Sequence, residues 1–372
     1  MRLAAPLLAG LLLFAAACER EASPPGEAPQ EAPSVTAPVS DELPGLPAPA
    51  TGIAFWDHPT LSFNGLMIVA TEDGVLSYSM EDGTEVSRID GFNADGVATG
   101  YLGLGDAAAG FIAFLDGDEN TFRFYGVDNQ SRAFLPLEAG PAIRGAVRGF
   151  CLGRGLGVAA PSLFVIQKDK IQVFNLAASE SGVAVDSQTE IAAPDNLVSC
   201  AVDLDGALLA AADTGDIYRL AGDNSFAAPF AKGPADRTGD LSVVPAAGEE
   251  DASGITGHLF LAGLAQGEVH VFDRETGAAL GSVRLIETSS LPAVGEAEVF
   301  GATGANLGAL YRNGVIAFGV AETEDGPAIR IAPASTVKNA LSLPLGEPVS
   351  PRGEAPTTED GGLIIPANFD QQ

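Results

Sequence analysis

The stretch LMIVATEDGVLSYSM (66–80) decides the fold, because an apolar run, a Glu-Asp-Gly turn and a second β-rich run follow one another in it. Alternating side chains with Val and Tyr indicate strands, and a DG turn between two such runs indicates a hairpin. The same unit recurs as FIAFLDGDENTFRFYG (111–126), LFVIQKDKIQVFNL (163–176), LLAAADTGDIYRL (208–220), LFLAGLAQGEVHVFD (259–273) and VIAFGVAETEDGPAIRI (315–331).

These six units begin 45 to 56 residues apart. Four short strands repeated about every 40–50 residues are the sequence signature of a β-propeller. A β-helix would need much shorter coils, and two stacked β-sandwiches would not keep so even a spacing. No long apolar pattern of helical period follows residue 17. The sequence therefore predicts an all-β chain, a six-bladed β-propeller over residues 51–372.

The composition limits the partners of this propeller. Of 372 residues, 19 are basic and 49 acidic, which gives a net charge of −30. Nucleic acid is excluded, since phosphate backbones are bound through Lys and Arg. Anionic lipid surfaces are disfavoured for the same reason. A polyanionic substrate would be repelled unless metal cations stood between it and the protein.

The N-terminus has the features of an export signal. Arg2 is followed by a short apolar run, and Ala15-Ala16-Ala17 immediately precedes Cys18. This pattern resembles the lipobox of bacterial lipoproteins, so we expect a signal peptide over residues 1–17 and lipidation of Cys18. An ordinary signal peptide with an incidental Cys18 is the alternative. Either reading places the protein outside the cytoplasm, and lipidation would anchor it to a bacterial membrane, facing the periplasm or the cell surface.

Residues 18–50 read as a disordered linker between the anchor and the propeller. This segment holds eight of the 25 prolines and almost no large apolar side chain. Such a composition cannot offset the entropy of ordering by burial.

Two segments are candidates for the strand that closes the ring, residues 52–56 and GLIIPANF (362–369).

Two cysteines remain in the folded part, Cys151 and Cys200. In an oxidising compartment an even pair favours a disulfide. The alternative is two buried thiols in neighbouring strands. With three scattered His, the two cysteines cannot build a structural zinc site.

The sequence lacks the motifs GxSxG, HExxH and the P-loop. Acidic residues instead fall at strand ends or loops of successive units, and equivalent loops of a propeller converge on one end of its channel. The residues concerned are Asp95, Asp169, Asp213, Asp240 and Glu298. Gathered at the channel mouth, their carboxylates would suit Ca²⁺. The alternative is a solvated acidic surface without a metal. Asp116–Asn120 looks like a calcium loop but fits an acidic hairpin turn better.

Several segments, in order along the chain, resemble the β-propeller phytases, six-bladed calcium-dependent phosphatases that act on inositol hexakisphosphate. The resemblance covers residues 50–340. It is carried by IAFWDHPTLSFNGLMIVATEDGVLSYSMEDG (53–83), GFNADGV (91–97), GFCLGR (149–154), SCAVDLDGALLAAADTGDIYRL (199–220), LAQGEVHVFDRETG (264–277) and GANLGALYRNGVIAF (304–318).

The resemblance implies a mechanism in which several Ca²⁺ ions at the channel mouth hold substrate phosphates and activate a water molecule. The five acidic residues above match the family's calcium ligands. Lys168 matches a phosphate-binding lysine, and Gln266 matches a polar residue of the same mouth. The resemblance assigns no catalytic residue in this chain.

The chain also departs from the family pattern. Glu72-Asp73 stands where a phosphate-binding lysine is expected, and an arginine is missing near Leu115. Acidic positions are replaced at Thr51-Gly52, Ser199 and Ser242. Two hypotheses follow: an exported, calcium-dependent, phytase-like phosphomonoesterase with a partly degraded site, or a lipid-anchored propeller without catalysis that acts as a binding or scaffold module.

Overall fold

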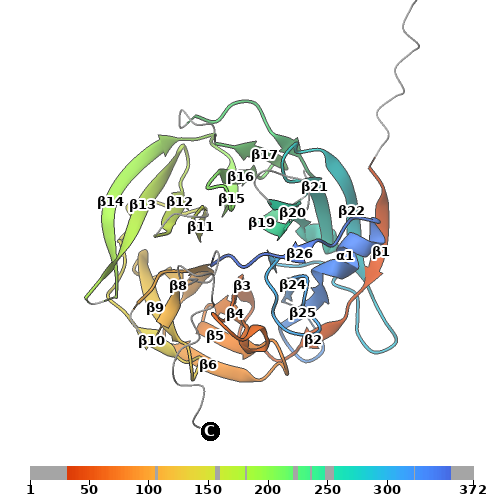
Figure 1. The fold of residues 1–372 in the computed structure, drawn as a ribbon, viewed down its shortest axis with the longest axis horizontal. Helices are drawn as coiled ribbons and strands as arrows, with labels where there is room; N and C mark the ends of the chain where they lie inside the picture. The colour runs from red at the N-terminus through yellow and green to blue at the C-terminus, as the bar shows by residue number, and fades with distance from the viewer. Residues whose placement is uncertain are drawn as a thin grey trace, which may run out of the picture. The chain divides into compact units, whose positions relative to one another are not determined.

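Six sheets, antiparallel except for one parallel edge strand, stand around a central channel in a computed structural model (Figure 1). The model describes residues 32–104, 108–155, 160–180, 182–220, 225–234, 237–247, 255–321 and 323–352. The innermost strand of each sheet contacts the innermost strands of both neighbours, so the ring is closed. The fold is therefore the predicted six-bladed β-propeller.

The blades follow the chain in order, and strands are given from the channel outwards. Blade 1 holds β3 (Ala50–Trp56), β4 (Leu66–Thr71), β5 (Gly74–Ser79) and β6 (Glu85–Asp90). Blade 2 holds β7 (Ala94–Gly100), β8 (Ala108–Asp116), β9 (Thr121–Asp128) and β10 (Phe134–Pro136). Blade 3 holds β11 (Gly149–Gly153), β12 (Ser162–Ile166), β13 (Lys170–Ser179) and β14 (Gly182–Ala192).

The other three blades complete the ring. Blade 4 holds β15 (Leu197–Val202), β16 (Leu208–Ala212), β17 (Asp216–Arg219) and β18 (Ala231–Lys232). Blade 5 holds β19 (Thr238–Ala247), β20 (Ile255–Gly263), β21 (Glu268–Asp273) and β22 (Ala279–Ile286), flanked by β26 (Glu347–Pro348) and β1 (Ser34–Pro38). Blade 6 holds β23 (Val299–Thr303), β24 (Val315–Val320), β25 (Ala328–Pro333) and β2 (Asp41–Leu43).

Within the described residues, helical structure is confined to short segments: η1 (Ser62–Asn64), η2 (Leu264–Gln266) and α1 (Ala334–Ala340). No helix in the part of the chain that the structure describes has the length and apolarity to cross a membrane.

The second strand of a blade is packed on both faces. Every residue of β4, β16 and β24 is buried. Because such a strand is packed between two neighbouring blades, its sequence is a short continuous apolar run. These runs are the most regular part of the sequence repeat. The core therefore lies between the blades, in clusters that join each sheet to the next.

The predicted linker over residues 18–50 is wrong for its second half. Strand β1 pairs in parallel with β22, and β2 pairs with β25. Ala37 and Val39 are buried in the core. Pro38 is tolerated because it lies at the end of an edge strand, where no ladder hydrogen bond is required of its nitrogen.

Strand β2 also settles how the ring closes. This N-terminal strand is the outermost strand of blade 6, whose other three strands come from the C-terminal part of the chain. Of the two predicted closing segments, residues 52–56 lie instead in the innermost strand of blade 1, and GLIIPANF (362–369) lies outside the described residues. The expected signal peptide, Cys18 and the first part of the linker also lie outside them.

Innermost strands approach each other so closely that glycine is required at some positions. A Cβ added at Gly149 would lie 2.2 Å from the carbonyl oxygen of Val198 in the neighbouring blade. By contrast, a Cβ at Gly103 would have no atom within 4 Å. The close approach of the two backbones therefore leaves no room for a side chain at Gly149.

We expect Gly149→Ala to lower the free energy of unfolding by about 1–3 kcal/mol, since overpacking forces backbone shifts. Urea denaturation measures this, with Gly103→Ala as the matched control that should leave stability within about 0.5 kcal/mol. An equally small effect of both substitutions would contradict the close approach.

Candidate functional site at the channel mouth

The seven predicted site residues all lie at one end of the channel. Innermost strands begin there, and because the strands alternate in direction, the turn between the second and third strands of each blade lies there too. We call this end the entry face and the opposite end the exit face. Asp95, Asp240 and Glu298 lie at starts of innermost strands, whereas Lys168, Asp169, Asp213 and Gln266 lie in or beside second-to-third connections.

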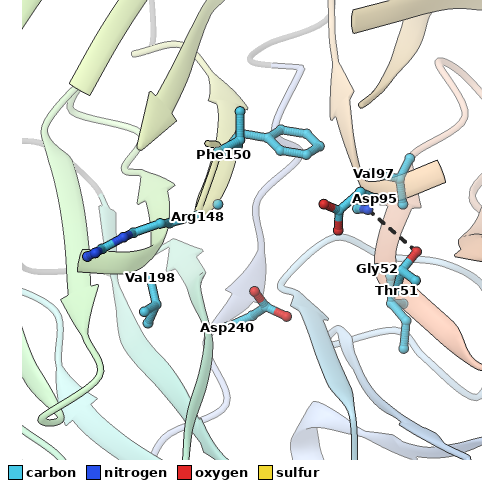
Figure 2. Close-up of a pocket in the computed structure, with 12 residues that line it drawn as sticks. Thr51, Gly52, Asp95, Val97, Arg148, Phe150, Val198 and Asp240 are labelled. Carbon is cyan, nitrogen blue, oxygen red and sulfur yellow. Dashed lines mark hydrogen bonds between the residues drawn. The ribbon is translucent and has the colours of Figure 1, made fainter. Parts of the chain in front are cut away.

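A cavity of about 160 Å³ opens on the entry face. Of the seven residues, it brings together only Asp95 of β7 and Asp240 of β19. Both carboxylates point into the cavity (Figure 2). The other side chains that line it are Thr51, Ile53, Val97, Val147, Arg148, Phe150 and Val198.

Asp240 is fixed in the wall between blades 5 and 6. Its Oδ2 accepts a hydrogen bond of 3.3 Å from the backbone N–H of Phe300, the second residue of β23. Burial raises the pKa of this carboxyl to about 6, and the hydrogen bond only partly offsets that rise. A carboxyl with a raised pKa in a cleft is typical of binding and catalytic sites.

The raised pKa of Asp240 predicts a pH dependence of stability. The unfolded carboxyl titrates near about 3.9, so the folded state holds an extra proton between roughly pH 4 and pH 6. The free energy of unfolding should therefore fall as pH rises through that window. Asp240→Asn should remove this slope in denaturation curves at several pH values, whereas Asp213→Asn, an exposed position on the same face, should keep it. An unchanged slope in Asp240→Asn would contradict the assignment.

Arg148 is the one basic side chain among the residues that line the cavity. Figure 2 shows its guanidinium directed away from Asp95 and Asp240. Its Nη1 donates to the carbonyl oxygen of Asp195, before the first strand of blade 4. Arg148 therefore links two blades and leaves the two carboxylates without a cationic partner inside the cavity.

The remaining predicted residues are exposed and lie outside the cavity. Glu298 pairs with Arg237, and Gln266 accepts a hydrogen bond from Arg284. Asp213 accepts one of 3.1 Å from Asn196. Lys168 and Asp169 lie on the hairpin between β12 and β13. The seven residues thus share one end of the channel, as the sequence predicted, but the structure does not gather their side chains around one point.

No group of three or more His, Cys, Asp or Glu side chains in the described ranges is arranged to hold a metal ion. This includes the Asp116–Asn120 segment, which forms the hairpin turn between β8 and β9; there Asp116 and Glu119 pair with Arg123. Asp95 and Asp240 are the two residues that could contribute to a cation site in the cavity. A multi-ion calcium centre would need more oxygen ligands than these two provide.

Strand β15 places one matched position outside the cavity. Ser199, where the resemblance places a glutamate, is turned toward blade 5: its hydroxyl donates to the carbonyl oxygen of Gly239 and accepts from the N–H of Leu241. The register shows a β-bulge between Leu197 and Ser199, and the unpaired residue Val198 lines the cavity.

Bonds between neighbouring innermost strands hold the channel wall together. A disulfide joins Cys151 of β11 to Cys200 of β15, with the two Cα atoms 5.5 Å apart. Thr99 donates to the carbonyl oxygen of Phe55 between blades 2 and 1, and Ser242 accepts from the N–H of Ala302 between blades 5 and 6. Several small polar side chains of this wall are thus used for assembly of the ring.

Comparisons with known proteins add little to these observations. No family model matches the chain, and no curated protein matches it. Among solved structures it is similar to Hsv2 of Kluyveromyces lactis, with 12% identity, 72% of this chain and 71% of that chain covered, and a TM-score of 0.38. The chain is also similar to a form of the same protein with a complete loop 6CD, with 13% identity, 73% of this chain and 70% of that chain covered, and a TM-score of 0.38. Likeness at this level carries no argument about function.

Proposed function

We propose that this protein is a non-catalytic binding propeller, whose ligand site is the cavity on the entry face. One observation carries the proposal: Asp95 and Asp240 point into a cavity whose other side chains are mostly apolar or bonded to neighbouring blades. A wall of this kind supplies charge and shape for recognition. It supplies few ligands for the several metal ions that phosphate transfer would require in a protein of net charge −30.

The chemistry of the cavity favours a positively charged ligand of side-chain size. A cavity of about 150 Å³ accommodates a molecule as large as benzene, so a guanidinium or ammonium group with part of its stem fits the space here. Two carboxylates with free acceptor oxygens would bind such a group by charge-assisted hydrogen bonds. An arginine or lysine side chain of a partner protein meets these requirements.

Calorimetric titration with arginine amide tests this proposal on residues 18–372 carrying Cys18→Ser. We expect binding that weakens about tenfold or more in Asp95→Asn or Asp240→Asn, because each loses a charge-assisted hydrogen bond. Asp213→Asn is the control on the same face and should bind normally, and inorganic phosphate should not bind. Equal binding by all variants would exclude the cavity as the site.

A second candidate is a calcium-dependent phosphomonoesterase acting on inositol hexakisphosphate or a related ester. It is favoured by one observation, that Asp95 and Asp240, both matched to calcium ligands by the resemblance, share one cavity. In that case Lys168 and Gln266 would have to reach the substrate from outside the cavity.

We also propose that the protein is exported and anchored through lipid on Cys18. The disulfide between Cys151 and Cys200 supports export, since such bonds persist in oxidising compartments. Expression of the full chain in bacteria with an alkyne-tagged fatty acid tests the anchor. Label in the membrane fraction that disappears in Cys18→Ser is expected, and label that persists in this variant would refute lipidation of Cys18.

A further inference from the structure

The segment 344–352, which we call the strap, crosses the exit face of the channel. It follows α1, passes through β26 and runs toward the middle of the ring (Figure 1). Its contacts lie where innermost strands finish: Ala246 and Ala247 at the end of β19, Asp57 after β3 and Arg154 after β11. One short segment therefore touches blades on opposite sides of the channel.

The root of the strap is held by blades 5 and 6. Glu347 and Pro348 pair with Ala247 and Ala246. Asn313 donates to the carbonyl oxygen of Gly346 at 3.0 Å. The buried ammonium of Lys338, on α1, donates to the carbonyl oxygen of Leu345 at 3.1 Å. These contacts are mainly to the backbone.

The tip of the strap is held across the channel by Arg352. Its guanidinium carbon lies 4.4 Å from the ring centre of Tyr101 and 5.2 Å from that of Trp56. Its Nε donates to the carbonyl oxygen of Asp57 and its Nη1 to that of Ala109, both at 2.6 Å. Two aromatic rings and two carbonyl oxygens thus form a site for a guanidinium group.

Neighbouring polar groups complete this site. The hydroxyl of Ser350 donates to the Asp57 carboxylate, and Arg154 donates to the carbonyl oxygen of Arg352. The Tyr101 hydroxyl, which accepts from the N–H of Asp57 at 3.0 Å, fixes the ring against the end of β3. The site is therefore built by blades 1 to 3 and filled by a residue from the other end of the chain.

We propose that the strap is a detachable latch over the exit-face mouth, and that the guanidinium of Arg352 is the group that fastens it. No residue of 344–352 belongs to the buried core, so the strap contributes no side chain of its own to the hydrophobic clusters. Segments with few buried apolar contacts open at lower free energy than the core around them. Release of Arg352 then uncovers an arginine-binding site made by Trp56, Asp57, Tyr101 and Ala109.

Trp56 provides a direct readout, because it is the one tryptophan in the chain and is fully buried beneath Arg352. In the full-length protein we expect Arg352→Ala to make Trp56 fluorescence several-fold more sensitive to acrylamide, with the same thermal unfolding temperature. Millimolar arginine amide should reverse this sensitivity by filling the vacated site. Arg312→Ala is the control, since Arg312 is exposed beside Glu347 at the strap's root, and it should leave quenching unchanged.

Arg352→Lys keeps the charge but cannot donate to both carbonyl oxygens with a planar group, so it should give an intermediate quenching constant. Unchanged shielding of Trp56 in Arg352→Ala would overturn the proposal. So would exposure that appears only together with a large drop in unfolding temperature, because the strap would then be an inseparable part of the fold.

Discussion

Asp203→Ala is expected to lower the free energy of unfolding by about 3–5 kcal/mol, the usual cost of removing one partner from a buried ion pair. Asp203 follows β15 of blade 4 and is fully buried. Its two carboxylate oxygens accept from Nε of Arg274, which follows β21 of blade 5, at 2.7 and 2.8 Å. Oδ1 also accepts from the N–H of Leu204 at 2.7 Å.

The large effect follows from the guanidinium that would remain. Arg274 is also buried, and its next carboxylate, that of Asp205, lies 3.7 Å away. Without Asp203, blade 5 would present a buried charge to blade 4 with its main counter-ion removed. Urea denaturation measures the loss, with Arg88→Ala as control: its pair with Glu85 is exposed, so this variant should lose less than about 1 kcal/mol. Similar losses in the two variants would contradict the account of the blade 4–5 contact.

Opening the Cys151–Cys200 disulfide should have an effect of comparable size. The two residues are separated by 49 positions, and a loop of that length corresponds to about 4 kcal/mol of stabilisation through restriction of the unfolded chain. We therefore expect the double variant Cys151→Ala, Cys200→Ala to unfold at clearly lower denaturant concentration than the oxidised protein.

The comparison needs a control for the two lost sulfur side chains. Wild-type protein kept reduced should unfold close to the double variant, and adding reductant to the variant should change nothing. If the oxidised and reduced wild-type proteins unfolded at the same denaturant concentration, the disulfide would contribute nothing to the ring.

The number of blades was predictable because burial on both faces forces the second strands to be continuous apolar runs. Strands β4 and β24 are examples. Strands β1 and β2 were missed since proline and small residues suggest an extended linker, and only tertiary pairing with β22 and β25 shows that this segment is ordered. Pairing between distant segments leaves no periodic signal in a short edge strand.

The sequence could predict at which end of the channel the candidate residues lie, but not which of their side chains meet. Propeller topology places the start of every innermost strand and every second-to-third turn at one end, so Asp95 and Asp240 could be expected near each other. That Glu298 would pair with Arg237 could not be inferred, because it depends on side-chain geometry across two blades. Arg352, whose partners lie about 240 to 300 residues earlier in the chain, gave no local signal at all.

The central claim is that this propeller binds a ligand and does not hydrolyse phosphate esters. The most direct test measures phosphate release from inositol hexakisphosphate by residues 18–372 with Cys18→Ser, once with millimolar Ca²⁺ and once with chelator. Circular dichroism on the same sample establishes that the protein is folded. The account predicts no release above the protein-free rate in either condition. Release that requires Ca²⁺ and disappears in Asp240→Ala would contradict it and establish a phytase-like enzyme.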